Sequence, residues 1–122
     1  MKKILIVDDS KTMTKVLSCM LLDYFPQDSI EIIKAEDGAD ALFALKENDI
    51  DLLFLDMMMP VVDGHGVAQY INSRELDVKT VIISSTLDKD VVTSLAKLGF
   101  KNFLPKPIHI STLEGILEKI GF

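Results

Sequence analysis

The chain has 122 residues and a formal net charge of -6, because 19 Asp and Glu residues outweigh 13 Lys and Arg residues. This length is close to the commonest size of one domain with one hydrophobic core. Acidic side chains are scattered and no stripe of Lys and Arg occurs, which argues against a protein that binds nucleic acid through its phosphates.

Five short apolar runs predict five β-strands. Most of the runs are nearly unbroken by polar residues, as expected for parallel strands that are covered on both faces. Two aspartates end the first run well short of the apolar region of a signal peptide, so we interpret it as a strand. In chain order the runs are residues 4–7, 30–33, 52–55, 81–83 and 103–104.

Stretches of helical spacing follow each of these runs. Each stretch carries an apolar stripe, which predicts a helix that packs on the sheet. The stripes are Val16, Leu17, Met20, Leu21 and Phe25; Ala41, Leu42 and Leu45; Val67, Ala68 and Ile71; Val91, Val92, Leu95 and Leu98; and Leu113, Ile116, Leu117 and Ile120.

Short oxygen-bearing side chains stand near the expected starts of these helices. Such side chains accept hydrogen bonds from backbone N–H groups that the helix leaves unpaired. Gly99 is a candidate for a left-handed residue that closes one helix. The candidate cap residues are Ser10, Asp37, Asp63, Asp88 and Ser111.

Strict alternation of strand and helix predicts a doubly wound α/β domain, with a parallel sheet and helices on both faces. We expect one domain over residues 1–122, with no output domain. Every apolar run is shorter than the roughly 18 residues that a membrane-spanning helix requires. We therefore expect a cytoplasmic protein without direct membrane insertion.

The single cysteine, Cys19, lies in an apolar helical stretch. One cysteine excludes an intramolecular disulfide and fits a reducing compartment. Its surroundings predict a small buried side chain rather than a reactive thiol.

Polar side chains stand just past the predicted strands, at the edge where ligands bind in open α/β sheets. Asp8 and Asp9 follow the first strand, and Asp56 follows the third. Ser84 ends the fourth strand, and Lys106 follows the fifth between two prolines. We therefore expect three acids, a hydroxyl group and a lysine at one edge of the sheet.

Three carboxylates in one place repel one another unless a cation neutralises them. Oxygen ligands without a nearby cysteine or histidine cluster suit a hard ion such as Mg²⁺, with Mn²⁺ as an alternative. A lysine beside such an ion would hold the negative charge of a phosphoryl group, and a hydroxyl group would add a hydrogen bond. Asp56 fits the nucleophile, because a carboxylate can attack phosphorus without a separate base.

These residues resemble the receiver domain of bacterial two-component response regulators. The resemblance rests on Asp8-Asp9, the Asp56-to-Pro60 stretch with Asp63-Gly64, Ser84, and Lys106-Pro107, and it covers essentially the whole chain. It implies a flavodoxin-like sheet of five parallel strands in the order 2-1-3-4-5 with five helices.

The resemblance also implies a role for each residue. Asp56 would take a phosphoryl group from a histidine kinase or a phosphotransfer protein, and Lys106 and Ser84 would contact the phosphoryl oxygens. Asp9, Asp56 and the backbone carbonyl of Met58 would bind Mg²⁺, with Asp8 holding metal-bound water. It further suggests a cis peptide bond between Lys106 and Pro107.

In such domains a hydroxyl residue and an aromatic residue on the last strand act as a switch that reshapes a protein-binding surface. Ser84 and Phe103 occupy these positions here. Threonine is commoner at the first position, and serine lacks the methyl group that restricts the rotamer. Tyrosine is frequent at the second, so steps that depend on a phenolic hydroxyl are unavailable.

The partners and pathway follow by analogy only. We expect a monomer that turns over no external substrate, a motility target such as a flagellar motor component, and no nucleic-acid partner.

Two alternative functions stay open. An aspartate-nucleophile phosphatase would need an acid two residues after Asp56, where Met58 stands. A nucleotide or flavin binder would need a Gly-rich or hydroxyl-rich loop after the first strand, where Asp8 and Asp9 would repel the phosphate.

Three methionines and two histidines invite other interpretations. Met57, Met58 and Met59 are expected to pack in the core or crevice rather than bind a soft metal. His65 and His109 lie far apart in the sequence. For both histidines we expect a surface or cap role rather than catalysis.

Overall fold

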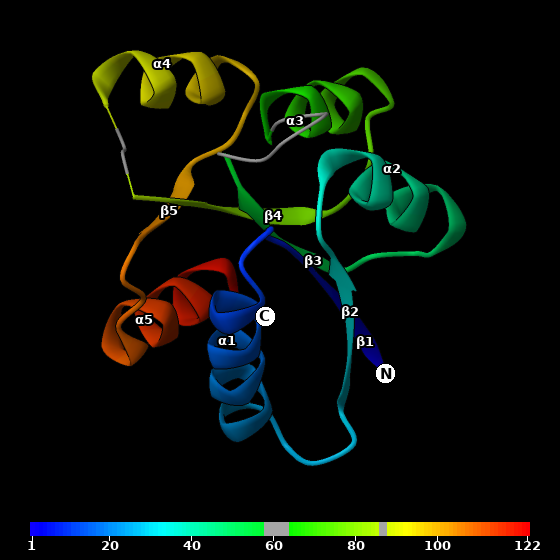
Figure 1. Cartoon of the computed structure of the whole chain (residues 1–122), viewed down its shortest axis with the longest axis vertical. Helices are drawn as coiled ribbons and strands as arrows, with labels where there is room; N and C mark the ends of the chain where they lie inside the picture. Colours follow the sequence, from blue (N-terminus) through cyan, green and yellow to red (C-terminus); the bar gives the residue numbers. More distant parts are fainter. Residues whose placement is uncertain (58–63, 86–87) are drawn as a thin grey trace.

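The structure is a computed structural model that describes residues 1–57, 64–85 and 88–122. It contains the predicted strands and helices in strict alternation (Figure 1). The strands are β1 (Lys2–Val7), β2 (Ile30–Ala35), β3 (Leu52–Asp56), β4 (Lys79–Ser84) and β5 (Asn102–Pro105). The helices are α1 (Lys11–Tyr24), α2 (Gly38–Glu47), α3 (Gly64–Ser73), α4 (Lys89–Lys97) and α5 (Ile110–Ile120).

The five strands form one parallel sheet in the order β2-β1-β3-β4-β5. The predicted flavodoxin-like order is therefore confirmed. Since all strands run the same way, their carboxyl ends lie at one edge of the sheet. β1 and β3 are neighbours near the middle of this sheet, which brings the residues after β1 close to the end of β3.

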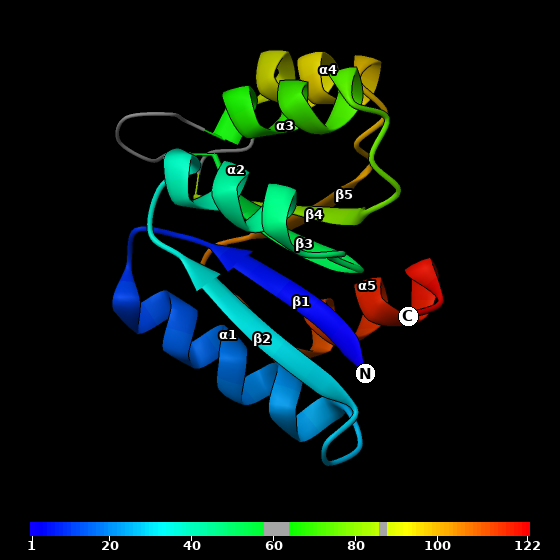
Figure 2. The same ribbon diagram turned by 90° about the vertical axis from the view of Figure 1, so that its right-hand side faces the viewer.

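Helices cover both faces of the sheet. α1 and α5 lie on one face, whereas α2, α3 and α4 lie on the other (Figures 1 and 2). Alternate side chains of β1 enter the two cores, because successive residues of a strand point to opposite faces. Ile4 and Ile6 pack with α1 and α5, and Leu5 and Val7 pack in the core beneath the other three helices.

Three of the predicted helix caps are confirmed. The side chain of Ser10 accepts a hydrogen bond from the Met13 N–H at 3.3 Å. Asp37 and Asp88 accept from the residues three positions on, each at 2.8 Å. Such bonds fix where α1, α2 and α4 begin.

The other helix-end predictions have mixed outcomes. The prediction for Ser111 is wrong, because His109 is the cap residue of α5 and Ser111 is the second residue of that helix. His109 makes no side-chain cap bond. Asp63 lies outside the described residues. Gly99 follows α4 with a φ of 95°, which confirms its left-handed conformation.

The prediction that Cys19 is buried is also wrong, because its side chain is exposed. Leu17 and Leu21 are the buried apolar side chains of α1. A residue two positions from each of them lies on the opposite side of a helix. Leu17 and Leu21 therefore face the sheet, whereas Cys19 faces outward. Among the described residues, no helix is both long and apolar enough to cross a membrane.

Candidate functional site

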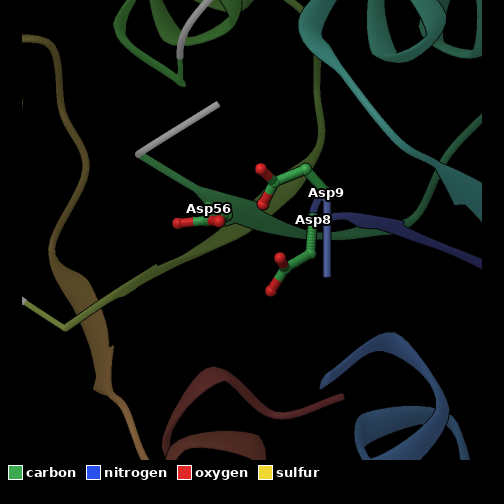
Figure 3. A group of neighbouring side chains, drawn as sticks. All are labelled: Asp8, Asp9 and Asp56. Carbon is green, nitrogen blue, oxygen red and sulfur yellow. The ribbon is translucent and has the colours of Figure 1, made fainter. Parts of the chain in front are cut away.

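Three carboxylates meet at the carboxyl edge of the sheet. Asp8 and Asp9 follow β1 and Asp56 ends β3, and one oxygen of each lies within 4.8 Å of the others (Figure 3). Asp8 and Asp56 are buried, with 3% and 2% of their surfaces exposed, and Asp9 is exposed. The three carboxylates lie close together because β1 and β3 are neighbours, and residues at the ends of adjacent parallel strands lie side by side.

Lys106 reaches two of these carboxylates from the loop after β5. Its ammonium nitrogen lies 3.1 Å from Asp8 Oδ2 and 3.3 Å from Asp56 Oδ2. Burial by itself lowers the pKa of Lys106, but the hydrogen bond to Asp8 and the charges of Asp56 and Asp8 outweigh it, so the pKa is raised above its ordinary value. The ammonium therefore stays charged at neutral pH.

The backbone around Lys106 is tied to the neighbouring strand. The Lys106 N–H donates to the carbonyl oxygen of Ser84 at 3.0 Å, which continues the pairing of β4 with β5. The peptide bond between Lys106 and Pro107 is cis, as the family resemblance suggests. The hydrogen bond to Ser84 holds the backbone of Lys106 beside the end of β4.

Backbone hydrogen bonds also orient the Asp8 carboxylate. The Asp8 N–H donates to the carbonyl oxygen of Ala35 at 3.1 Å, which extends the pairing of β1 with β2 by one residue. The Ser10 N–H donates to Asp8 Oδ1 at 2.9 Å. Oδ1 thus accepts a backbone bond while Oδ2 faces Lys106. The sequence indicates Ser10 only as a helix cap, so this second role was missed.

Gly64 is part of the motif that carries the family resemblance, but the sequence alone did not reveal why a glycine stands at this position. A Cβ atom at this position would lie 2.6 Å from the carbonyl oxygen of Asp56 and 2.7 Å from Met57 Cα. Both are backbone atoms, which cannot move aside cheaply. The Gly64 N–H also donates to the Met57 carbonyl oxygen at 3.4 Å. The start of α3 therefore lies directly against the backbone that carries Asp56, and only glycine fits there.

The two predicted switch residues lie on the strands beyond Asp56. Ser84 ends β4 and is 2% exposed, and Phe103 lies in β5. The Phe103 ring is half-buried and packs against the core beneath α2, α3 and α4. Their roles stay predictions. Met58 lies outside the described residues. The prediction that its carbonyl binds the metal, and its bearing on the phosphatase hypothesis, are therefore not tested by the structure.

The donor set at this edge fits a hard divalent cation. Asp8, Asp9 and Asp56 offer oxygen ligands only, and their total charge exceeds what Lys106 alone can balance. Magnesium prefers carboxylate oxygens and keeps several waters, which the exposed side of Asp9 would permit. A bound Mg²⁺ would neutralise the carboxylates and the oxygens of an arriving phosphoryl group.

The fold and this edge define a class of α/β domain with an acidic, lysine-clamped pocket at the carboxyl ends of its strands. The model of the response regulator receiver domain family matches residues 4–118. The chain therefore belongs to the response regulator receiver domain family, whose members accept phosphoryl groups in two-component signalling and act as switches. The predicted family is confirmed.

Individual relatives agree with this assignment. "Probable transcriptional regulator ycf27" from Porphyridium aerugineum is 32% identical over 122 residues, which cover 98% of this chain and 48% of that protein. The signal receiver domain of a DNA binding response regulator from Colwellia psychrerythraea 34H superposes with a TM-score of 0.88 at 26% identity, covering 99% of this chain and 98% of that one.

A third similar protein is in the crystal structure of the CheX-CheY-BeF3-Mg+2 complex from Borrelia burgdorferi. It has a TM-score of 0.88 and 26% identity, with 99% of this chain and 90% of that chain covered. The chain spans about half the length of the first curated relatives that it matches. These relatives therefore share the receiver domain with this chain, and their remaining parts lie outside the match.

Proposed function

We propose that Asp56 is the phosphoacceptor of this receiver domain. The observation that carries the proposal is the Lys106 ammonium, which lies between the buried carboxylates of Asp8 and Asp56. A buried nucleophile beside a fixed cation and a potential metal site has the parts that phosphoryl transfer needs, which are positioning and charge neutralisation.

In the proposed step an oxygen of Asp56 forms a bond to phosphorus while the bond from phosphorus to the donor breaks. The electron pair of that bond leaves with the donor group, and a histidine donor that carries a proton on its other ring nitrogen is left as a neutral imidazole. Lys106 and Ser84 would contact the phosphoryl oxygens. Asp9, Asp56 and the Met58 carbonyl would hold Mg²⁺, with Asp8 holding metal-bound water, and the Mg²⁺ of the similar CheX-CheY-BeF3-Mg+2 complex from Borrelia burgdorferi supports a magnesium site in such a domain.

We further propose that the phosphoryl group comes from a histidine kinase or phosphotransfer protein and changes a protein-binding surface through Ser84 and Phe103. Phe103 supports this route, because its half-buried ring packs in the same core as Leu95 of α4. Leu95 is the buried residue of α4, so movement of the ring would reach the helix through few contacts. The expected readout is a changed position of α4 relative to β5.

The target and setting stay proposals. A flagellar motor component is the proposed target by analogy only, whereas the first curated relatives are named as transcriptional regulators. We also propose a cytoplasmic monomer that exchanges its phosphoryl group with proteins rather than turning over an external substrate. Affinity capture with wild type and Asp56→Asn, each with and without phosphodonor, would separate a motility target from a transcriptional one.

Intact-mass measurement tests the phosphoacceptor directly. Incubation with a small phosphodonor and Mg²⁺ should add the mass of one phosphoryl group to the wild type. Asp56→Asn should add none, and Asp51→Asn is the matched control because Asp51 precedes the same strand at its opposite end. Labelling of Asp56→Asn at the wild-type rate would contradict the proposal.

A further inference from the structure

A groove of about 390 Å³ opens beside the acidic cluster, between the first turns of α1 and the carboxyl end of β2. These two elements lie side by side (Figure 2). The groove has a floor of buried residues and a rim of exposed charged residues. The floor residues are Asp8, Thr14 and Ala35, and the rim residues are Lys11, Lys15, Lys34 and Glu36.

The groove and the candidate site share one residue. Asp8 lines the groove, and the same side chain bonds to Lys106 at 3.1 Å. The hydrogen bond from the Asp8 N–H to Ala35 holds the end of β2 against this point. The pairing of Lys34 with Ile6 then places a lysine one residue before the strand ends. The rim therefore borders the mouth of the acidic site.

The rim is positively charged although the chain as a whole carries -6. Lys11 and Lys15 are four residues apart on α1 and so lie on one side of the helix. Lys11 lies 3.8 Å from Glu36, but both side chains are largely exposed, at 87% and 65%, so water screens this pair. Three lysines against one glutamate leave an excess of positive charge at the rim.

Helix stability does not account for Lys11. It is the first residue of α1, and the first turn of this helix carries no acidic residue. A positive charge near the amino end of a helix is unfavourable, because the helix dipole is positive there. In α2 and α4 the first turn instead carries an acid, Asp40 or Asp90. Lys11 therefore contributes positive charge at a place where the helix itself gains nothing from it.

We propose that Lys11, Lys15 and Lys34, called the rim lysines below, attract small anionic phosphodonors of the acyl phosphate class to the site. This inference rests on the proposed function of Asp56. In the transfer an Asp56 oxygen bonds to phosphorus, the bond from phosphorus to the acyl oxygen breaks, and its electron pair leaves as a carboxylate without any proton transfer. The carboxylates of Asp8, Asp9 and Asp56 repel a negatively charged donor. The rim lysines offset that repulsion while the donor approaches the site.

The test compares two triple variants that remove the same charge from different places. Lys11→Gln/Lys15→Gln/Lys34→Gln neutralises the rim. Lys46→Gln/Lys97→Gln/Lys119→Gln neutralises exposed lysines in the last turns of α2, α4 and α5. These helices begin near the carboxyl edge of the sheet and end at the opposite edge, away from the acidic site. The second variant therefore removes the same charge without changing the rim, and it controls for net charge.

Phosphorylation of Asp56 is followed by intact mass at saturating Mg²⁺, with acetyl phosphate and phosphoramidate as donors. The ammonium group of phosphoramidate partly cancels its phosphoryl charge. At an ionic strength of about 0.02 M we expect the rim variant to react about tenfold more slowly with acetyl phosphate, and about threefold more slowly with phosphoramidate. At an ionic strength of about 0.5 M, the wild type should react less than about twofold faster than the rim variant with either donor.

Two further results complete the test. Glu36→Gln should raise the acetyl phosphate rate, because it removes the negative charge of the rim. Equal rates for the rim variant and the control variant at low ionic strength would overturn the inference while Asp56 stays labelled. Absence of labelling in the wild type would instead overturn the proposed function, so the two failures are distinguishable.

Discussion

The ammonium of Lys106 lies 3.3 Å from Asp56 Oδ2, and both side chains are largely buried. The same ammonium lies 3.1 Å from Asp8 Oδ2, so one cation separates two buried carboxylates. This contact joins the end of β3, the residue after β1 and the loop after β5. Removal of this ammonium would leave two buried carboxylates close together without a cation between them.

Lys106→Met should lower the free energy of unfolding by about 2 kcal/mol in buffer without Mg²⁺, because the two buried carboxylates of Asp8 and Asp56 then face each other without the ammonium between them. Methionine keeps the length of the aliphatic side chain, so the change mainly removes charge. Urea unfolding would measure the loss, and millimolar Mg²⁺ should restore part of it. Lys119→Met is the control, since Lys119 is exposed on α5. Equal effects of the two substitutions would argue against a buried ionic role for Lys106.

Asp9→Asn should weaken Mg²⁺ binding about tenfold, because it removes one of the carboxylates that the ion would neutralise. Its effect on stability without metal should be small, since Asp9 is exposed. The midpoint of thermal unfolding, measured against Mg²⁺ concentration, reports the affinity through linkage. Asp49→Asn removes an exposed acid after α2 as a control. A wild-type Mg²⁺ dependence in Asp9→Asn would exclude Asp9 from the metal site.

Gly64→Ala should destabilise the protein by about 2 kcal/mol, because the new methyl group would meet the backbone of Asp56 and Met57. Phosphorylation should slow as well, since the backbone that carries the nucleophile must shift. Gly115→Ala gives a matched control with the opposite sign. Gly115 lies within α5 with open space around its Cβ position, so alanine should stabilise by about 0.5 kcal/mol. Equal unfolding midpoints for both variants would contradict the close approach at Gly64.

A hydrogen bond of 2.9 Å joins His65 of α3 to Ser94 of α4. α4 buries Leu95 against the sheet, so this side-chain contact should account for a measurable part of its anchoring. Ser94→Ala should therefore raise the hydrogen exchange rates of α4 amides several-fold, corresponding to about 1 kcal/mol. Thr93→Ala changes the exposed neighbour and serves as the control. Unchanged exchange in α4 would show that the bond contributes nothing to its anchoring.

The sequence was sufficient to predict the strands, their order and the strand-end acids, because each depends on local apolar patterning or on a resemblance that covers the whole chain. Asp8, Asp9 and Asp56 could be placed at one edge since parallel strands end together. The exposure of Cys19 was missed, because the composition of a helical stretch does not give the angular position of one residue.

Contacts between distant elements were harder to predict. The bond between His65 and Ser94 joins two helices whose relative position is set by packing on the sheet. The closeness of Lys34 to Lys11 and Lys15 depends on β2 lying beside α1, and nothing in the spacing of these lysines indicates it. The requirement for Gly64 depends on the backbone of Asp56 passing within 2.6 Å of a potential Cβ atom, a distance that only three-dimensional structure supplies.

The most direct test of the central claim is to identify the modified side chain chemically. After reaction with acetyl phosphate and Mg²⁺, borohydride reduces an aspartyl phosphate to homoserine, and tandem mass spectrometry locates it in the chain. The account predicts homoserine at position 56 and nowhere else, and its loss when the donor is omitted. Homoserine at Asp8 or Asp9, or a labelled protein with an unmodified Asp56, would contradict the assignment of Asp56 as the phosphoacceptor.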